Sequence, residues 1–93
     1  MRNYELMVLL QSDLDEAAYN DVVSKINGWV TESSGTVDKT DDWGIRRMAY
    51  QIRKQRDSHY VLFHLSLEPT ATKELERNIR FLEPVMRHML SVV

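Results

Sequence analysis

The sequence contains no cysteine, three glycines and only two prolines among its 93 residues. Without cysteine, the chain has no disulfide framework and no thiol for a metal site or for catalysis, which fits a reducing compartment. No repeat, linker or low-complexity segment divides it. No apolar run approaches the roughly 20 residues of a membrane span, and the short N-terminal run lacks the features of a signal peptide. We therefore predict a single domain over residues 1–93, without membrane contact, in a cytoplasm or an organelle matrix.

Groups that carry chemistry are scarce as well. The only histidines are His59, His64 and His88. His59 and His64 are five residues apart in a predicted strand, so their side chains point to opposite faces and cannot share a metal ion. Asp41 and Asp42 are adjacent in an extended segment, which separates their carboxylates and leaves no acid–base pair. The sequence therefore predicts no metal, no cofactor, no small-molecule substrate and no enzymatic activity.

Charge is nearly balanced overall but unevenly spread. The formal net charge is −2, with −6 over residues 1–45 and +4 over residues 46–93. This is either the ordinary segregation of a solvated surface or a dipolar domain whose basic part faces a polyanion. A net acidic chain is a poor non-specific RNA binder. Any RNA binding should therefore be local and assisted by a partner protein.

Hydrophobic periodicity predicts the order strand, helix, strand, strand, helix, strand. The expected segments are 2–10, 13–35, 36–53, 59–67, 70–81 and 86–93. Two such split units give an α+β, ferredoxin-like β-α-β-β-α-β fold, with a four-stranded antiparallel sheet in the order 4-1-3-2 and both helices on one face. The first and third strands are then central, and the second strand lies at an edge.

Local signals suggest how these segments begin and end. Asp13 is the expected N-cap of the first helix, with Glu16 completing a capping box. Gly35 can take the left-handed conformation at the end of that helix. Gly44 within the second strand indicates a bulge or a bend. The polar residues Gln55–Ser58 form the expected hairpin turn.

The stretch 41–56, DDWGIRRMAYQIRKQR, begins acidic and ends basic on this edge strand. Asp41, Asp42, Arg46 and Arg47 have two compatible interpretations. Charges on an exposed edge prevent unwanted pairing with other strands. The same charges can select a protein partner by complementarity.

The sheet face away from the helices carries apolar side chains. Met7, Leu9, Leu62 and Met89 are expected there, either as scattered surface residues or as a protein-contact patch. Tyr60 is the only aromatic residue expected on this face of the third strand. An RNA recognition motif requires several aromatics and a glycine there, so the sequence argues against that class.

Several landmarks resemble one known family. The opening MRNYE, the segment WGIRRMAY at 43–50, HYVL at 59–62, ELE at 74–76 and VMR at 85–87 are similar to the motifs of the bacterial-type small-subunit ribosomal protein six family, the S-six family, in matching order and spacing. The resemblance covers essentially the whole chain. Gln51 stands where the family usually has proline, and Ser34 where a second glycine is common.

The resemblance implies a structural, non-catalytic constituent of the small ribosomal subunit. Such proteins bind the central domain of the small-subunit ribosomal RNA together with the small-subunit protein eighteen. Matching landmarks make Arg2 and Arg87 the first candidates for RNA contacts. The further candidates are Arg46, Arg53, Lys54, Arg56 and Arg80.

Two other functions remain open from the residues alone. The first is a stand-alone protein-interaction or regulatory module of the same fold. The second is a small enzyme of the acylphosphatase type, which is disfavoured because the loop after the first strand, Leu10–Asp13, is acidic and lacks a glycine-rich anion site.

Overall fold

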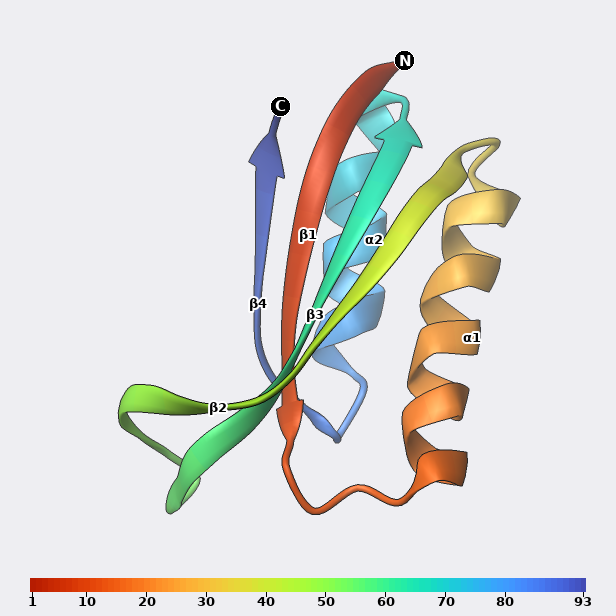
Figure 1. The fold of residues 1–93 in the computed structure, drawn as a ribbon. Helices are drawn as coiled ribbons and strands as arrows, with labels where there is room; N and C mark the ends of the chain where they lie inside the picture. Colours follow the sequence, from red (N-terminus) through yellow and green to blue (C-terminus); the bar gives the residue numbers. More distant parts are fainter.

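The computed structural model describes residues 1–93. Its elements are β1 (Arg2–Gln11), α1 (Glu16–Glu32), β2 (Thr36–Ile52), β3 (Gln55–Leu67), the short 3₁₀ helix η1 (Pro69–Ala71), α2 (Thr72–Arg80) and β4 (Val85–Val92). The strands form one antiparallel sheet in the order β2-β3-β1-β4, with both helices on the same face (Figure 1). The predicted ferredoxin-like topology is confirmed.

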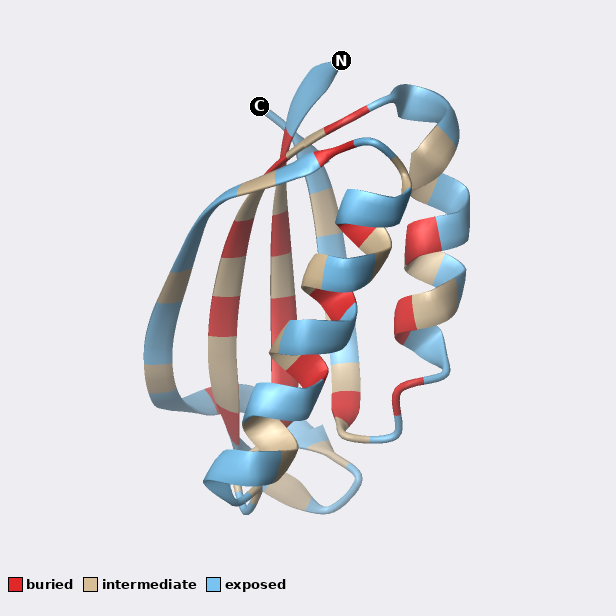
Figure 2. Ribbon diagram, turned by 90° about the vertical axis from the view of Figure 1, so that its right-hand side faces the viewer, coloured by how far each residue is buried: buried red, intermediate tan, exposed pale blue.

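The core lies between the helices and the inner face of the sheet, as the buried stripes in Figure 2 show. Alternate residues of the two central strands point inward, because side chains alternate across a strand. Leu6 on β1 pairs with Phe63 on β3, and both are fully buried. Burying one such side chain contributes about 1.5–3 kcal/mol. The helices cover this face with Val22, Ile26, Val30, Leu75 and Ile79.

The first helix begins two residues later than the capping pattern predicts. Asp15 is the N-cap, and its Oδ1 accepts a hydrogen bond from the backbone N–H of Ala18 at 2.8 Å. Glu16 is the first helical residue, so the capping box with Asp13 is wrong. The chain leaves β1 through a turn in which the N–H of Ser12 bonds the Gln55 side chain, and this turn occupies the residues assigned to the cap.

We therefore expect Asp15→Ala to lower the free energy of unfolding by about 1 kcal/mol, because an N–H at the helix start loses its acceptor. The matched control is Asp13→Ala, which removes the same charge two residues earlier and should have little effect. Urea denaturation of both variants is the measurement. Equal losses, or a larger loss for Asp13→Ala, would contradict this assignment.

The end of α1 also differs from the expectation. Ser34, not Gly35, takes the left-handed conformation, with φ of 63°. Gly35 is required for a different reason, since a Cβ atom there would lie 2.5 Å from Leu67 Cδ2 and 2.5 Å from the carbonyl oxygen of Ser66. The absence of a side chain at Gly35 lets the helix end pack directly on β3.

Gly35→Ala should consequently destabilise the protein by about 1–3 kcal/mol, the usual cost of inserting a methyl group into a packed site. Gly28 is the contrasting position, because it is mid-helix and a Cβ atom added there would meet nothing within 4 Å. Gly28→Ala should raise stability by up to about 1 kcal/mol. Thermal and urea denaturation measure both effects, and a neutral Gly35→Ala would show that the strand can move away.

The β2–β3 hairpin turns at Arg53-Lys54 and not at Gln55–Ser58. Arg53 and Lys54 have φ values of 52° and 64°, and Ile52 pairs with Gln55 across the turn, which is the geometry of a two-residue type I′ turn. The expected interruption of β2 is present, because the register shifts between Asp42 and Gly44, where Gly44 has φ of 76°. Residues 46–57, beyond this bulge, are termed the arm.

Candidate nucleic-acid and protein interface

The arm extends past the end of β1 and bends across the lower end of the sheet toward β4 (Figure 1). The guanidinium of Arg53 holds it there, donating from Nη1 to the carbonyl of Glu83 at 2.7 Å and from Nη2 to that of Val85 at 3.3 Å. Gln55 accepts the N–H of Ser12 at 3.2 Å. The arm is therefore fixed to the α2–β4 loop and to the β1–α1 loop.

A third contact joins the arm to β4. Arg87 Nη1 donates to the Tyr50 hydroxyl oxygen at 2.6 Å. Arg87 is the cross-strand partner of Leu9, whose other neighbour is Tyr60. Leu9 is on the outer face, as expected, but only 4 % exposed, so its assignment to an exposed contact patch is wrong. Leu9 is flanked by Tyr60 on β3 and by Arg87 on β4, and sequence alternation alone does not reveal its burial.

The remaining apolar residues of the outer face form a shallow groove. Met7 lies at its centre, paired with Leu62 on β3 and Met89 on β4. Trp43, 42 % exposed, extends the apolar surface from the bulge in β2. The outer-face groove, about 310 Å³, is lined by Glu5, Met7, Trp43, Leu62, Met89 and Ser91. Trp43 was not among the predicted contact residues, although its position beside the bulge glycine was the available signal.

The adjacent acidic residues of β2 point to opposite faces, as predicted. On the outer face, Asp41 accepts a bond from His64 at 3.1 Å, which lowers the pKa of this carboxyl. On the helix side, Asp42 lies 2.6 Å from His59 Nε2 and accepts the Tyr19 hydroxyl at 3.1 Å. Both carboxylates are thus engaged within the fold.

Tyr19, His59 and Asp42 join α1 to the edge of the sheet. The rings of Tyr19 and His59 stack with centroids 4.7 Å apart and an angle of 6° between their planes. Partial burial, followed by the charge of Asp42 and the bond to it, raises the pKa of Tyr19 to about 12. For Asp42, partial burial opposes the shift, but bonds from His59 and the N–H of Gly44 lower the pKa below its ordinary value.

A group whose pKa is raised by folding stabilises the fold below its unfolded pKa and loses that contribution as pH rises through the folded value. For Tyr19 the window runs from pH 10.0 to about 12. We expect the stability advantage of the wild type over Tyr19→Phe to shrink across this window, as measured by urea denaturation at several pH values. An advantage that stays constant or grows with pH would contradict the assigned bond to Asp42.

The structure does not bring the two leading basic candidates together. Arg2 and Arg87 are on neighbouring strands, but Arg87 is opposite Leu9, seven positions along β1 from Arg2. At about 3.3 Å per residue the two positions are roughly 23 Å apart. Arg2 shares the alternation of the helix-facing residues, whereas Arg87 points outward. They cannot form one compact RNA site.

The other basic candidates fall into two groups. Arg53, Lys54 and Arg56 are in the arm, together with Arg46, whose guanidinium carbon lies 5.2 Å from the ring centroid of Trp43. Such a cation–π contact helps to hold both side chains.

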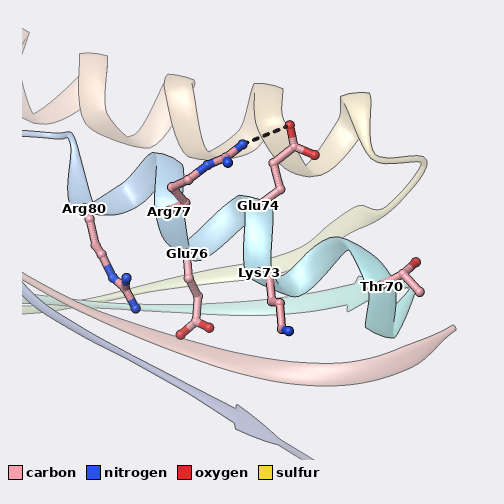
Figure 3. Close-up of a pocket in the computed structure, with 6 residues that line it drawn as sticks. All are labelled: Thr70, Lys73, Glu74, Glu76, Arg77 and Arg80. Carbon is pink, nitrogen blue, oxygen red and sulfur yellow. Dashed lines mark ion pairs between the residues drawn. The ribbon is translucent and has the colours of Figure 1, made fainter.

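Arg80 is separate, in a groove of about 630 Å³ along α2 (Figure 3). This groove is lined by Thr70, Lys73, Glu74, Glu76, Arg77 and Arg80. Arg77 lies 3.9 Å from Glu74, and Glu76 lies 3.2 Å from His88. With no apolar side chain in the lining, this groove has the character of a solvated helix side.

No three His, Cys, Asp or Glu side chains are grouped as a metal site. None of the helices is long and apolar enough to span a membrane.

The topology and the open outer face define a ferredoxin-like α+β protein without a deep pocket. Solved structures share this fold: 30S ribosomal protein S6 from Thermotoga maritima matches with a TM-score of 0.92 and 24% identity, covering 99% of this chain and 87% of that one. The C-terminal domain of MgtC from Mycobacterium tuberculosis matches with a TM-score of 0.70 and 12% identity, covering 100% and 88%. These likenesses establish the fold.

The sequence comparisons establish the family. The family model of "Ribosomal protein S6" matches residues 3–91. Small ribosomal subunit protein bS6 of an Exiguobacterium species is 43% identical, covering 96% of this chain and 94% of the relative, and that of Streptomyces griseus is 41% identical, covering 94% and 91%. The chain belongs to the ribosomal protein S6 family of the small ribosomal subunit, which confirms the resemblance drawn from its motifs.

Proposed function

We propose that this protein is a structural, non-catalytic, single-domain component of the cytoplasmic small ribosomal subunit. In this role it binds the central domain of the small-subunit ribosomal RNA together with the small-subunit protein eighteen. The observation that carries the proposal is the family match over residues 3–91. The separation of a basic arm from an apolar groove on the same open face supports it, because it provides one surface for each partner.

The arm is the proposed RNA side. It holds five basic side chains against one acidic residue, a net charge of +4, whereas the rest of the chain carries −6. RNA phosphates are attracted to such a local concentration of positive charge even when the whole protein is acidic. Arg2 and Arg87 add contacts at the two ends of the sheet, and Arg80 adds one from α2. Arg87 uses one N–H for Tyr50 and retains the others for a phosphate.

The outer-face groove is the proposed surface for protein eighteen. Met7, Leu62, Met89 and Trp43 supply apolar area that water would leave on binding. The adjoining edge of β2 carries Asp41 and Asp42, followed by Arg46 and Arg47 at the start of the arm, where the two proposed surfaces meet. Both oxygens of each aspartate already have partners within the fold, so the two carboxylates present fixed negative charge at this edge, which can select the partner and keeps the edge from pairing with another copy.

In this proposal the two partners, bound side by side on one small domain, also contact each other, and that contact makes their binding cooperative. A coupling free energy of about 1–3 kcal/mol corresponds to a 5- to 150-fold gain in RNA affinity when protein eighteen is present. The net charge of −2 accounts for weak binding without that partner.

The test is association with ribosomes in cells, followed by reconstitution. The tagged protein should sediment with small ribosomal subunits, and it should bind a central-domain RNA fragment tightly only with protein eighteen. A stand-alone regulatory module would sediment apart from ribosomal subunits. Tight RNA binding without the second protein at near-physiological salt would contradict the proposed cooperativity.

A paired substitution tests the outlying arginines. Arg2→Ala with Arg87→Ala should weaken RNA binding in the reconstituted complex and reduce the log–log salt slope by about one unit for each lost phosphate contact. Lys73→Ala with Arg77→Ala removes the same net charge from α2 and should change the slope little. An unchanged affinity and slope in the first variant would remove Arg2 and Arg87 from the RNA surface.

A further inference from the structure

We propose that the arm holds a site for one unpaired RNA nucleotide, with Tyr50 as the stacking surface for the base and Arg47 and Arg56 as ligands of the flanking phosphates. This deepens the proposed function and rests on it for the identity of the RNA. The site is the arm groove, about 360 Å³, lined by Arg47, Met48, Ala49, Tyr50, Gln51 and Arg56.

Tyr50 has the properties of a prepared stacking surface. It is 60 % exposed, so much of the side chain is open to a ligand. Its hydroxyl is nevertheless held by Arg87 at 2.6 Å, so the side chain is tethered at its outer end before any ligand arrives. A base that stacks on such a ring orders few side-chain torsions, which lowers the entropic cost of binding.

The charges around the ring are unneutralised. Arg47, Lys54 and Arg56 form no ion pair and no side-chain hydrogen bond in the structure, although Asp57 is the cross-strand neighbour of Arg47. The basic residue Arg77 on α2, by contrast, lies beside Glu74. A groove with two free guanidinium groups and an exposed aromatic ring combines the backbone attraction and base stacking used in single-stranded nucleic-acid binding.

The arm is also held in place well enough to present this groove. Arg53 fixes the tip to Glu83 and Val85, and Gln55 fixes the returning strand to Ser12. Arg53 and Arg87 are therefore positioning residues of the site, because each acts through the placement of the arm or of Tyr50. This assigns Arg53 a different role from the direct RNA contact expected from its charge alone.

The geometry favours an unpaired nucleotide over a duplex or a protein. In a duplex both faces of each base are covered by neighbouring bases, so an exposed ring gains nothing by stacking. A protein segment would leave the two free guanidinium groups of Arg47 and Arg56 without matching anions unless it were acidic, whereas every nucleotide brings a phosphate.

The experiment is an NMR titration of the ¹⁵N-labelled full chain with a single-stranded RNA of eight uridines and, separately, with an RNA duplex of eight base pairs. We expect the single strand to shift the amides of residues 47–56 and to bind more tightly than the duplex. Tyr50→Ala should weaken binding of the single strand about 5- to 150-fold, the range for loss of one stacked base. Tyr50→Phe keeps the ring and should retain most of the affinity.

The phosphate ligands are tested by the salt dependence. Arg47→Ala with Arg56→Ala should reduce the log–log slope for the single strand by about 1.4, since each phosphate contact contributes about 0.7. Lys73→Ala with Arg77→Ala is the control of equal charge and should leave the slope unchanged. Tyr50→Trp is a second ring-retaining variant, and amide spectra without RNA verify that each variant is folded.

Three results would overturn the site. They are wild-type affinity in Tyr50→Ala, equal reductions of the salt slope in the Arg47→Ala, Arg56→Ala double variant and in its control, and the absence of single-strand binding at low salt. Loss of binding to protein eighteen in Tyr50→Ala, with RNA binding intact, would make the arm a protein contact instead. The outcome is separable from that of the proposed function. If the protein sediments with ribosomal subunits but Tyr50→Ala has no effect on RNA binding, only the nucleotide site is wrong. If the protein binds the single strand as expected but does not associate with ribosomal subunits, only the ribosomal role is wrong.

Discussion

The pairing of β1 with β3 is the interaction on which the rest of this structure depends. Ten consecutive residue pairs, from Arg2 with Leu67 to Gln11 with Ser58, run without a bulge. A shift of one residue would turn every inward side chain of β1 to the other face, so the buried pair Leu6 and Phe63 holds the register. The same register places Met7 beside Leu62 and thereby forms the centre of the outer-face groove.

The arm exists because β3 is longer than its partner. The ladder with β1 ends at Ser58, whose hydroxyl donates to the carbonyl of Leu10 at 2.8 Å and is fully buried. Residues before Ser58 have no β1 partner, so the hairpin leaves the sheet there. Within the arm, Arg47 pairs with Asp57 and Ile52 pairs with Gln55, with a register shift between them. The tip is held by Arg53, which reaches the carbonyls of Glu83 and Val85 at the start of β4. A small fold thus acquires a basic projection without enlarging its core.

The sequence predicted the features that depend on neighbouring residues and missed those that depend on contacts between distant segments. The alternation in β1 and β3 and the stripe of α1 are local periodicities, and they predicted the topology and the inward faces correctly. The bulge at Gly44 was also visible, because a glycine inside a strand typically marks a bulge or a tight bend. The resemblance to the ribosomal protein S6 family came from the order and spacing of motifs. These identify the fold but do not give the arrangement of side chains on its surface.

The errors arose where distant segments meet. The local pattern favoured Asp13 as the cap because Glu16 would complete a capping box. The turn whose Ser12 N–H bonds Gln55 occupies residues 12–13 and leaves the cap to Asp15. Gln55 was assigned to the turn because a turn at Arg53-Lys54 needs both residues in the left-handed conformation. Residues other than glycine rarely adopt that conformation.

The predicted site residues show the same limit. Leu9 was expected to be exposed because the alternation of β1 gives its face but not its neighbours Tyr60 and Arg87 on the adjacent strands. The separation of Arg2 from Arg87 depends on strand register rather than on strand adjacency. Trp43 lies in the bulge of β2 and lines the outer-face groove. The sequence indicates the bulge but not the sheet face to which its side chain points.

The central claim is that RNA and protein partner bind different parts of one face, and the methionines report on it directly. Met48 lines the arm groove, whereas Met7 and Met89 line the outer-face groove. With ¹³C-labelled methionine methyls, protein eighteen should shift the signals of Met7 and Met89 and leave Met48 in place. A central-domain RNA fragment added to that complex should then shift Met48. If protein eighteen instead moves Met48 while Met7 and Met89 stay unchanged, the division of the two surfaces is wrong.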